Sequence, residues 1–343
     1  MMVKTVLVSG ATGFIAGHTI ERLLAAGHKV VGTVRDPSAE AKLAHFRAMP
    51  GAERLQLVAA DLTDADPFSP YTDVDVIMHM ASPYRPNVAD PQRDLIDPAV
   101  QGTLSMLRAA AAQPRVRRVV LTSSMAAVTD EPDGRVLTEA DWNTKSSLTR
   151  NPYYYSKALA ERAAWDFVAR ERPGFDLVVI NPFLVIGPAH TSAINASPEI
   201  FVNIIKGVFP AVFALNWGVV DVRDVADAHI AAMTRPNAAG RYLCVGGAMS
   251  MAEAVALMRA EGYGAKLPRL ALTGPIGTAL MKAISYTQPA GTGSYLRTNL
   301  GRTLRYDASK SQQELGINYR DAAASLRDTL ADLERWGHIA KSA

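Results

Sequence analysis

A tyrosine and a lysine four residues apart, Tyr153 and Lys157, have the types and spacing that most directly suggest chemistry. On a helix, residues four apart share one face. A free tyrosine, with a pKa of about 10, exchanges protons poorly at neutral pH. A neighbouring ammonium stabilises the phenolate and lowers that pKa, so the pair can serve general acid–base catalysis. A serine hydroxyl from Thr122-Ser123-Ser124 could orient a substrate carbonyl beside them.

The same spacing recurs at Tyr306 and Lys310, so spacing alone is not specific. The first copy opens a predicted helix over residues 153–170, which follows a strand that ends in the serines. No strand ending in serine precedes the second copy, which we interpret as a strand end and a helix start. We therefore expect the chemistry at Tyr153.

A glycine-rich turn, Gly10-Ala11-Thr12-Gly13-Phe14-Ile15-Ala16, lies between a predicted strand and a predicted helix. Glycines at such a turn let a pyrophosphate approach the backbone, and the helix N-terminus supplies free N–H groups and a positive dipole. A plain tight turn is the alternative. The position between strand and helix, close to the start of the chain, favours a dinucleotide site.

Charged residues follow the next two predicted strands. Arg35 comes directly after the second strand, where an arginine suits the 2′-phosphate of NADP and an acid suits the ribose of NAD. Asp36 is adjacent, so the sequence leaves NAD open, and an ordinary surface arginine is the alternative for Arg35. Asp61, with Leu62 after it, follows the third strand, where its carboxylate could accept from the adenine amino group or cap a helix.

Short, almost wholly apolar runs alternate with helical patterns over the first two-thirds of the chain. Strands that are apolar on both faces are typical of a parallel sheet covered by helices on each side. The predicted strands are residues 5–9, 29–34, 55–59, 74–80, 118–123 and 177–181, and the predicted helices are 14–26, 94–112 and 153–170. The predicted fold class is α/β, a doubly wound parallel sheet of the Rossmann type.

The last third has more Gly, Pro and helical patterns and fewer strands. Ser250 opens a predicted capping box, and residues 241–245 predict a late strand that returns to the sheet. We expect a smaller, mostly helical C-terminal substrate lobe. The predicted division is a dinucleotide-binding domain over 1–187, with 217–246 returning to it, and a substrate lobe over 188–216 and 247–343.

Together these motifs resemble the extended short-chain dehydrogenase/reductases. The resemblance is greatest to the branch of dihydroflavonol reductases, cinnamoyl-CoA reductases and microbial aldehyde and ketone reductases. It rests further on His79-Met80-Ala81-Ser82-Pro83, Asn181-Pro182-Phe183-Leu184-Val185-Ile186-Gly187-Pro188 and Asp221-Val222-Arg223-Asp224-Val225-Ala226. Ala16 stands where dihydroflavonol reductases usually have glycine, which weakens the case for a flavonoid substrate.

The resemblance implies roles for individual residues. Ser124, Tyr153 and Lys157 would form the catalytic triad, with Tyr153 protonating the carbonyl oxygen as hydride arrives from the nicotinamide. Ser123 competes with Ser124 for the role of the serine, and the motif register favours Ser124. The expected cofactor is NADP(H), and its implied contacts are Gly10, Thr12, Gly13, Phe14, Ile15, Arg35, Lys42, Asp61, Leu62, Ala81, Tyr153, Lys157, Pro182, Val185 and Ser197.

Composition limits the other possibilities. With 48% apolar and 20% charged residues the chain is typical of a globular protein, and a net charge of +3 without a basic stripe predicts no nucleic-acid partner. The apolar run over 208–220 contains Pro210 and Gly218 and predicts a loop or pocket wall, so we expect no membrane span.

The single cysteine, Cys244, favours a reducing cytoplasm. Without a zinc-protease motif we expect no metal, and we interpret His79 as a satisfied core histidine.

The leading hypothesis is an NADPH-dependent, reversible reductase of a small aldehyde or ketone, acting as a monomer or homodimer. An NAD-dependent sugar-nucleotide epimerase or an enzyme like 3β-hydroxysteroid dehydrogenase is the alternative that Arg35 argues against. A non-catalytic NADPH-sensing regulatory protein is the alternative that the complete Ser-Tyr-Lys set argues against. Residues 188–216 and 260–300 are expected to form the pocket wall, with Met125, Tyr84, Phe183 and Phe201 as candidates for either pocket or core. Which carbonyl compound is reduced stays open.

Overall fold

The computed structural model describes residues 2–83 and 88–342. Its centre is a seven-stranded sheet in the order β11-β7-β5-β4-β1-β2-β3, and every described pairing in it is parallel. The strands are β1 (Thr5–Ser9), β2 (Lys29–Val34), β3 (Leu55–Ala59), β4 (Val76–His79), β5 (Arg118–Thr122), β7 (Asp176–Pro182) and β11 (Gly240–Cys244). The predicted doubly wound parallel sheet is confirmed.

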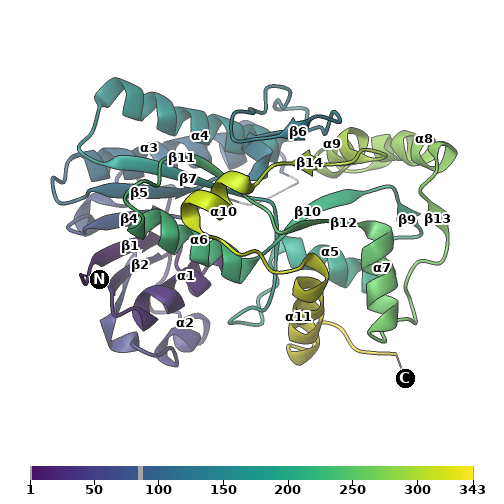
Figure 1. Ribbon diagram of the computed structural model, residues 1–343, viewed down its shortest axis with the longest axis horizontal. Helices are drawn as coiled ribbons and strands as arrows, with labels where there is room; N and C mark the ends of the chain where they lie inside the picture. Colours follow the sequence, from purple (N-terminus) through teal and green to yellow (C-terminus); the bar gives the residue numbers. More distant parts are fainter. Residues whose placement is uncertain (1, 84–87, 343) are drawn as a thin grey trace.

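Helices cover both faces of this sheet (Figure 1). On one face α1 (Phe14–Ala25) packs against α6 (Val222–Thr234), and on the other α3 (Asp97–Ala111) packs against α4 (Pro152–Glu171). Val6 and Val8 of β1 belong to the core under α1 and α6, whereas Leu7 belongs to the core under α3 and α4. Because successive side chains of a strand point to opposite faces, a wholly apolar strand needs a helical layer on each side.

Shorter elements complete this half of the molecule. They are α2 (Glu40–Arg47), after β2, and α10 (Ser309–Leu315), which contacts β11 and α6. Two-residue strands β6 (Val136–Leu137) and β14 (Arg305–Tyr306) pair in parallel. The prediction that residues 306–310 form a strand end and a helix start is confirmed, since β14 ends at Tyr306 and α10 begins at Ser309.

The second lobe is built around a three-stranded sheet in the order β12-β10-β8. Its strands are β8 (Leu184–Ile186), β10 (Asn216–Asp221) and β12 (Gly247–Ser250), and β9 (Val212–Phe213) pairs separately with β13 (Ala271–Leu272). The helices are α5 (Ala196–Ile205), α7 (Met251–Ala260), α8 (Pro275–Ile284), α9 (Ala290–Asn299) and α11 (Ala322–Arg335). These elements share a core of their own, and Figure 1 shows them beside the main sheet.

The apolar run over 208–220 is more regular than predicted. It contains β9 and most of β10, whose backbone groups pair with neighbouring strands, and Trp217 is buried in the core of the second lobe. The run is therefore not a loop throughout, but the alternative of a pocket wall is confirmed, since Phe209, Leu215 and Trp217 line the pocket described below. The domain division stays a prediction: β10 lies in the small sheet, whereas α6 and β11 after it belong to the main sheet.

The ends of the helices follow local sequence signals. The predicted capping box is confirmed at the start of α7, where the side chains and backbone groups of Ser250 and Glu253 bond reciprocally. The helix predicted over 94–112 begins later, at Asp97, because a wider helical turn over Gln92–Ile96 precedes it. Among residues 2–83 and 88–342, no helix has the length and apolar character that a membrane crossing requires.

Candidate active site

The glycine-rich turn joins β1 to α1 at the carboxyl edge of the main sheet. Gly10 has a φ of +67°, a conformation that favours glycine, and its N–H bonds to the Thr33 hydroxyl. A Cβ on Gly10 would lie 3.0 Å from the Cα of Ala81, so a side chain there would collide with the end of β4. Gly13 caps α1, whose first turn carries no acidic residue. This N-terminus has room and free N–H groups for a dinucleotide pyrophosphate, and the pyrophosphate site stays a prediction.

A buried serine holds Ala81 against this turn. The Ser9 hydroxyl oxygen accepts from the backbone N–H groups of Met80 (2.9 Å) and Ala81 (3.0 Å), and it lies 2.8 Å from Nδ1 of His79. Its own proton is therefore directed to His79. Burial, with the nearby charge of Lys157, lowers the pKa of His79 to about 3. The interpretation of His79 as a satisfied core histidine is confirmed.

Two exposed cations lie where the adenosine end of a dinucleotide is expected. Arg35 follows β2 and Lys42 lies on α2, and neither side chain has a hydrogen bond or ion pair with another described residue. Asp36 instead bonds to both the backbone and the hydroxyl of Ser38. The 2′-phosphate of a dinucleotide bound here could pair with both cations. The carboxylate of Asp36 is already bonded within its own turn.

Asp61 lies at the end of the neighbouring strand. Its carboxylate accepts from the backbone N–H and the hydroxyl of Thr63, at 2.9 and 2.8 Å. These bonds, with help from Arg35, lower the pKa of Asp61. The carboxylate closes a turn, and no helix begins among the described residues here, so the alternative of a helix cap is wrong. Leu62, after it, packs against Gly102 of α3.

The serine, tyrosine and lysine come together at the end of β5 and the start of α4. Ser124 begins a short helical turn, and it lines the same pocket as Tyr153, which lies in the first turn of α4. The ammonium of Lys157 is 5.9 Å from the centre of the Tyr153 ring. Burial lowers the pKa of Lys157 to about 8, against the opposing effect of Glu161. Ser123 is turned away and donates to Glu161. The geometry favours Ser124 over Ser123.

Glu161 is a residue that the sequence analysis missed. Its buried carboxylate accepts from the Ser123 hydroxyl (2.5 Å), the Asn181 amide (2.8 Å) and Nε of Arg241 (2.6 Å). The Asn181 amide also donates to the backbone carbonyl of Ser124 at 3.2 Å. This network ties α4 to β5, β7 and β11 directly behind the catalytic side chains. One signal was available: Glu161 lies four residues after Lys157, on the same helix face.

The start of α4 is also attached to the second lobe. Asn151, with a φ of +48°, precedes the helix and donates from its backbone to the hydroxyl of Ser294. Its side-chain amide donates to Thr298 at 3.1 Å, and both partners lie on α9. The position of Tyr153, two residues later, therefore depends on contacts between the lobes.

A pocket of about 440 Å³ opens in front of Ser124 and Tyr153. Its wall is mainly apolar and aromatic, with contributions from β8, α5, β10 and α9. The apolar lining includes Met125, Phe183, Phe209, Leu215, Trp217, Tyr295, Leu296 and Leu304. Such a pocket suits a small organic substrate with an apolar body.

Most of the residues predicted to line the pocket or to contact the cofactor lie at the carboxyl edge of the main sheet, and some do not. Ser197 lines the pocket, as do Met125 and Phe183. Phe201 is fully buried in the core of the second lobe, against Trp217, and does not line it. Pro182 ends β7, and Val185 lies in β8 and the main core. Tyr84 lies outside the described residues.

Three features define a dinucleotide-dependent enzyme of the Rossmann class: the parallel sheet, the glycine turn, and a serine and a tyrosine at one pocket with a lysine beside the tyrosine. The sequence profile of the NAD dependent epimerase/dehydratase family matches residues 6–246. The chain belongs to this family, and the predicted membership of the extended short-chain dehydrogenase/reductases is confirmed.

Similar proteins of known name are mostly reductases. Cinnamoyl-CoA reductase CAD2 of Medicago truncatula is 41% identical over 278 residues, covering 77% of this chain and 83% of the relative. Tetraketide alpha-pyrone reductase 1 of Arabidopsis thaliana is 32% identical and covers 97% of this chain and 96% of its own length. The solved structure of Gre2 from Candida albicans in complex with NADPH has a TM-score of 0.80 and 32% identity, covering 97% and 99% of the two chains.

Proposed function

We propose that this protein reduces the carbonyl group of an aldehyde or ketone to an alcohol, with NADPH as the hydride donor and Tyr153 as the proton donor. Carbonyl reduction, the oxidoreductase class and NADP(H), all predicted from the sequence, are confirmed by the comparisons. The role of Tyr153 and the other site residues stays a prediction. The observation that supports it best is that Ser124 and Tyr153 line one apolar pocket, with Lys157 one helical turn behind.

The residues at the start of α1 and after β2 have an arrangement that suits NADPH. Gly10 closely approaches Ala81 at the edge of the sheet where α1 begins, and no side chain bonds to the free N–H groups of the first turn of α1. The cations Arg35 and Lys42 follow the neighbouring strand β2. NADPH bound there supplies a hydride to the substrate carbon.

The catalytic side chains complete the reaction. Ser124 and Tyr153 would donate hydrogen bonds to the substrate oxygen, and Tyr153 would transfer its proton as negative charge develops there. The ammonium of Lys157 stabilises the phenolate that remains. The apolar wall holds the rest of the substrate and keeps water away, so we propose substrates whose carbonyl carries an aromatic or branched apolar group.

The test is NADPH consumption over aldehydes, aryl ketones, β-keto esters and a dihydroflavonol, with NADH alongside. We expect turnover with NADPH, its loss in Tyr153→Phe, and unchanged NADPH binding in that variant. A Tyr153→Phe enzyme with full activity would refute the proposed proton donor. Tight NADPH binding without turnover on any carbonyl would favour the sensing protein. Location in the cytoplasm, a monomer or homodimer, and the lack of a nucleic-acid partner stay predictions.

A further inference from the structure

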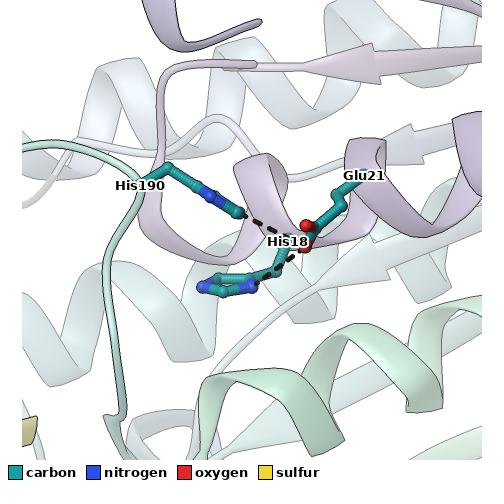
Figure 2. Close-up of side chains that lie close together, drawn as sticks. All are labelled: His18, Glu21 and His190. Atoms are coloured by element: carbon teal, nitrogen blue, oxygen red, sulfur yellow. Dashed lines mark ion pairs between the residues drawn. The ribbon is translucent and has the colours of Figure 1, made fainter. Parts of the chain in front are cut away.

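A histidine-rich cluster lies outside the pocket, where α1 meets the segment that connects β8 to α5. His18 and Glu21 share one face of α1, and His190 reaches the same point from the connecting segment (Figure 2). Nδ1 of His18 and Nε2 of His190 lie 3.7 and 3.5 Å from the same oxygen of Glu21. The three ligand atoms all lie within 4.8 Å of one another.

The hydrogen bond that Nε2 of His18 makes shows which ring nitrogen carries the proton. Nε2 lies 2.8 Å from the backbone carbonyl of Pro188, which can only accept, so Nε2 carries the proton. A neutral imidazole with its proton on Nε2 has a lone pair on Nδ1. That lone pair faces the carboxylate of Glu21. Two acceptors face each other, an arrangement that a cation between them would stabilise.

Both histidine nitrogens lack a hydrogen bond within the described part of the chain. Nδ1 of His18 and Nε2 of His190 are buried, and the His18 side chain is only 7% exposed. Buried nitrogens without a hydrogen bond are uncommon and need an explanation. A metal ion is the ligand that two imidazole lone pairs and a carboxylate can share.

We propose that His18, Glu21 and His190 bind a divalent transition-metal ion, with Zn²⁺ as the best match. Two ligands of a tetrahedral zinc, with bonds of about 2.0–2.1 Å, are roughly 3.3 Å apart. The two distances to Glu21, 3.7 and 3.5 Å, are close to this value. The two histidine nitrogens lie within 4.8 Å of each other and would also have to approach. The bond from Nε2 of His18 to a backbone carbonyl is the outer contact that orients most metal-binding histidines.

The surroundings allow such an ion. All three residues line a surface pocket of about 420 Å³, from which a water molecule could reach the ion as a fourth ligand. Three arginines also line this pocket, and each is paired with a carboxylate. Arg22 pairs with Asp227 and lies 3.9 Å from the Glu21 oxygen. Arg223 pairs with Asp221 and Asp328, and Arg335 pairs with Asp332. His190 also packs over Gly17, where a Cβ would meet its ring at 3.2 Å. The ion would fasten the connecting segment to the helix that opens the dinucleotide site.

Binding is tested on the metal-free, full-length protein without a histidine tag. Co²⁺ is titrated first, because four-coordinate Co²⁺ absorbs strongly in visible light, and Zn²⁺ is then added to displace it. Calorimetry gives the stoichiometry. We expect one ion per chain, with Zn²⁺ replacing Co²⁺.

The variants are Glu21→Gln and His190→Gln, with His45→Gln as the matched control. His45 stacks near His190, 6.2 Å between ring centres, but is outside the proposed ligand set. Loss of a ligand should weaken binding by more than the roughly 10- to 100-fold that loss of an outer contact costs. The control should bind as the unmodified protein does. Circular dichroism and NADPH binding check that each variant is folded.

Two results would overturn the proposal. One is the absence of stoichiometric binding by the unmodified protein. The other is equal affinity in all three variants, which would place the ion elsewhere. Neither result bears on carbonyl reduction, because the three ligands lie outside the catalytic pocket.

Discussion

At the scale of single residues, cofactor choice depends on side chains that fold stability does not need. Arg35 is exposed and makes no ion pair within the described ranges, so its removal should leave the fold unchanged. A guanidinium matches a phosphate through paired, charge-assisted hydrogen bonds. The turn that engages Asp36 with Ser38 keeps that carboxylate from competing for the same site.

For Arg35→Ala we expect KM for NADPH to rise roughly 10- to 100-fold, as the loss of hydrogen bonds to a charged group predicts, with KM for NADH nearly unchanged. Steady-state kinetics with both cofactors measure this. Arg47→Ala is the control, since Arg47 is an exposed arginine at the end of α2, and it should leave both values unaltered. An equal loss with NADH would show that Arg35 does not read the 2′-phosphate.

A second property at this scale is the charge on Lys157. Its pKa is lowered to about 8 by burial, so the ammonium is present below that pH and is lost above it. We expect kcat/KM for NADPH-dependent reduction to fall as pH rises through about 8. Lys157→Arg, which keeps its charge at higher pH, should move this fall upward even if the rate is lower. The same midpoint in both enzymes would exclude Lys157 as its origin.

At the scale of elements, α4 organises the site. Its first turn carries Tyr153, its second carries Lys157, and its third carries Glu161, whose carboxylate reaches three neighbouring strands. The register of the helix, set by Asn151 and the contacts with α9, therefore aligns the catalytic residues with the end of β5.

We expect Glu161→Gln to destabilise the protein by about 3–5 kcal/mol, because it leaves the buried guanidinium of Arg241 without its charged partner. Urea unfolding measures the loss. The exposed Glu171→Gln, at the end of the same helix, is the control. Glu161→Gln should also lower the pH at which activity falls, since a negative charge that supports Lys157 is removed. Equal stability of the two variants would contradict the inferred network.

The sequence predicted features that depend on neighbouring residues, and it did not predict features that depend on contacts between residues far apart in the chain. The strands of the main sheet and α4 were predicted nearly to the residue, because apolar runs and helical spacing are local signals. Glu161 was not singled out, since its partners Asn181 and Arg241 lie far along the chain. The cluster of His18, Glu21 and His190 was missed for the same reason. The small sheet was missed because β8 and β12 are too short for a pattern.

At the scale of the whole molecule, the substrate pocket is built from residues of both lobes, so activity depends on the folding of both. The pocket takes Ser124 and Tyr153 from the main sheet and its helices, and its apolar wall largely from the second lobe. Folding of both parts is therefore required before a substrate can be positioned. Conditions that unfold the main core should remove activity and binding together.

The pH dependence of unfolding follows from histidines in that core. His229 is fully buried, with Nδ1 donating to the Val225 carbonyl and Nε2 accepting from Thr122. Burial lowers its pKa to about 4, and that of His79 to about 3. The unfolded chain binds protons at these residues near pH 6.5, and the folded protein does not. Stability present above pH 6.5 is therefore lost as the pH falls toward 4.

Each such histidine should contribute a slope of about 1.4 kcal/mol per pH unit to the free energy of unfolding between pH 6.5 and 4.5. His229→Gln, whose amide can still donate and accept, should reduce the measured slope by about one histidine's share, whatever its absolute stability. Urea unfolding at pH 7, 6 and 5 gives both slopes. Parallel curves for the two proteins would mean that His229 is protonated in the folded state, in conflict with its position between a carbonyl and a donating hydroxyl.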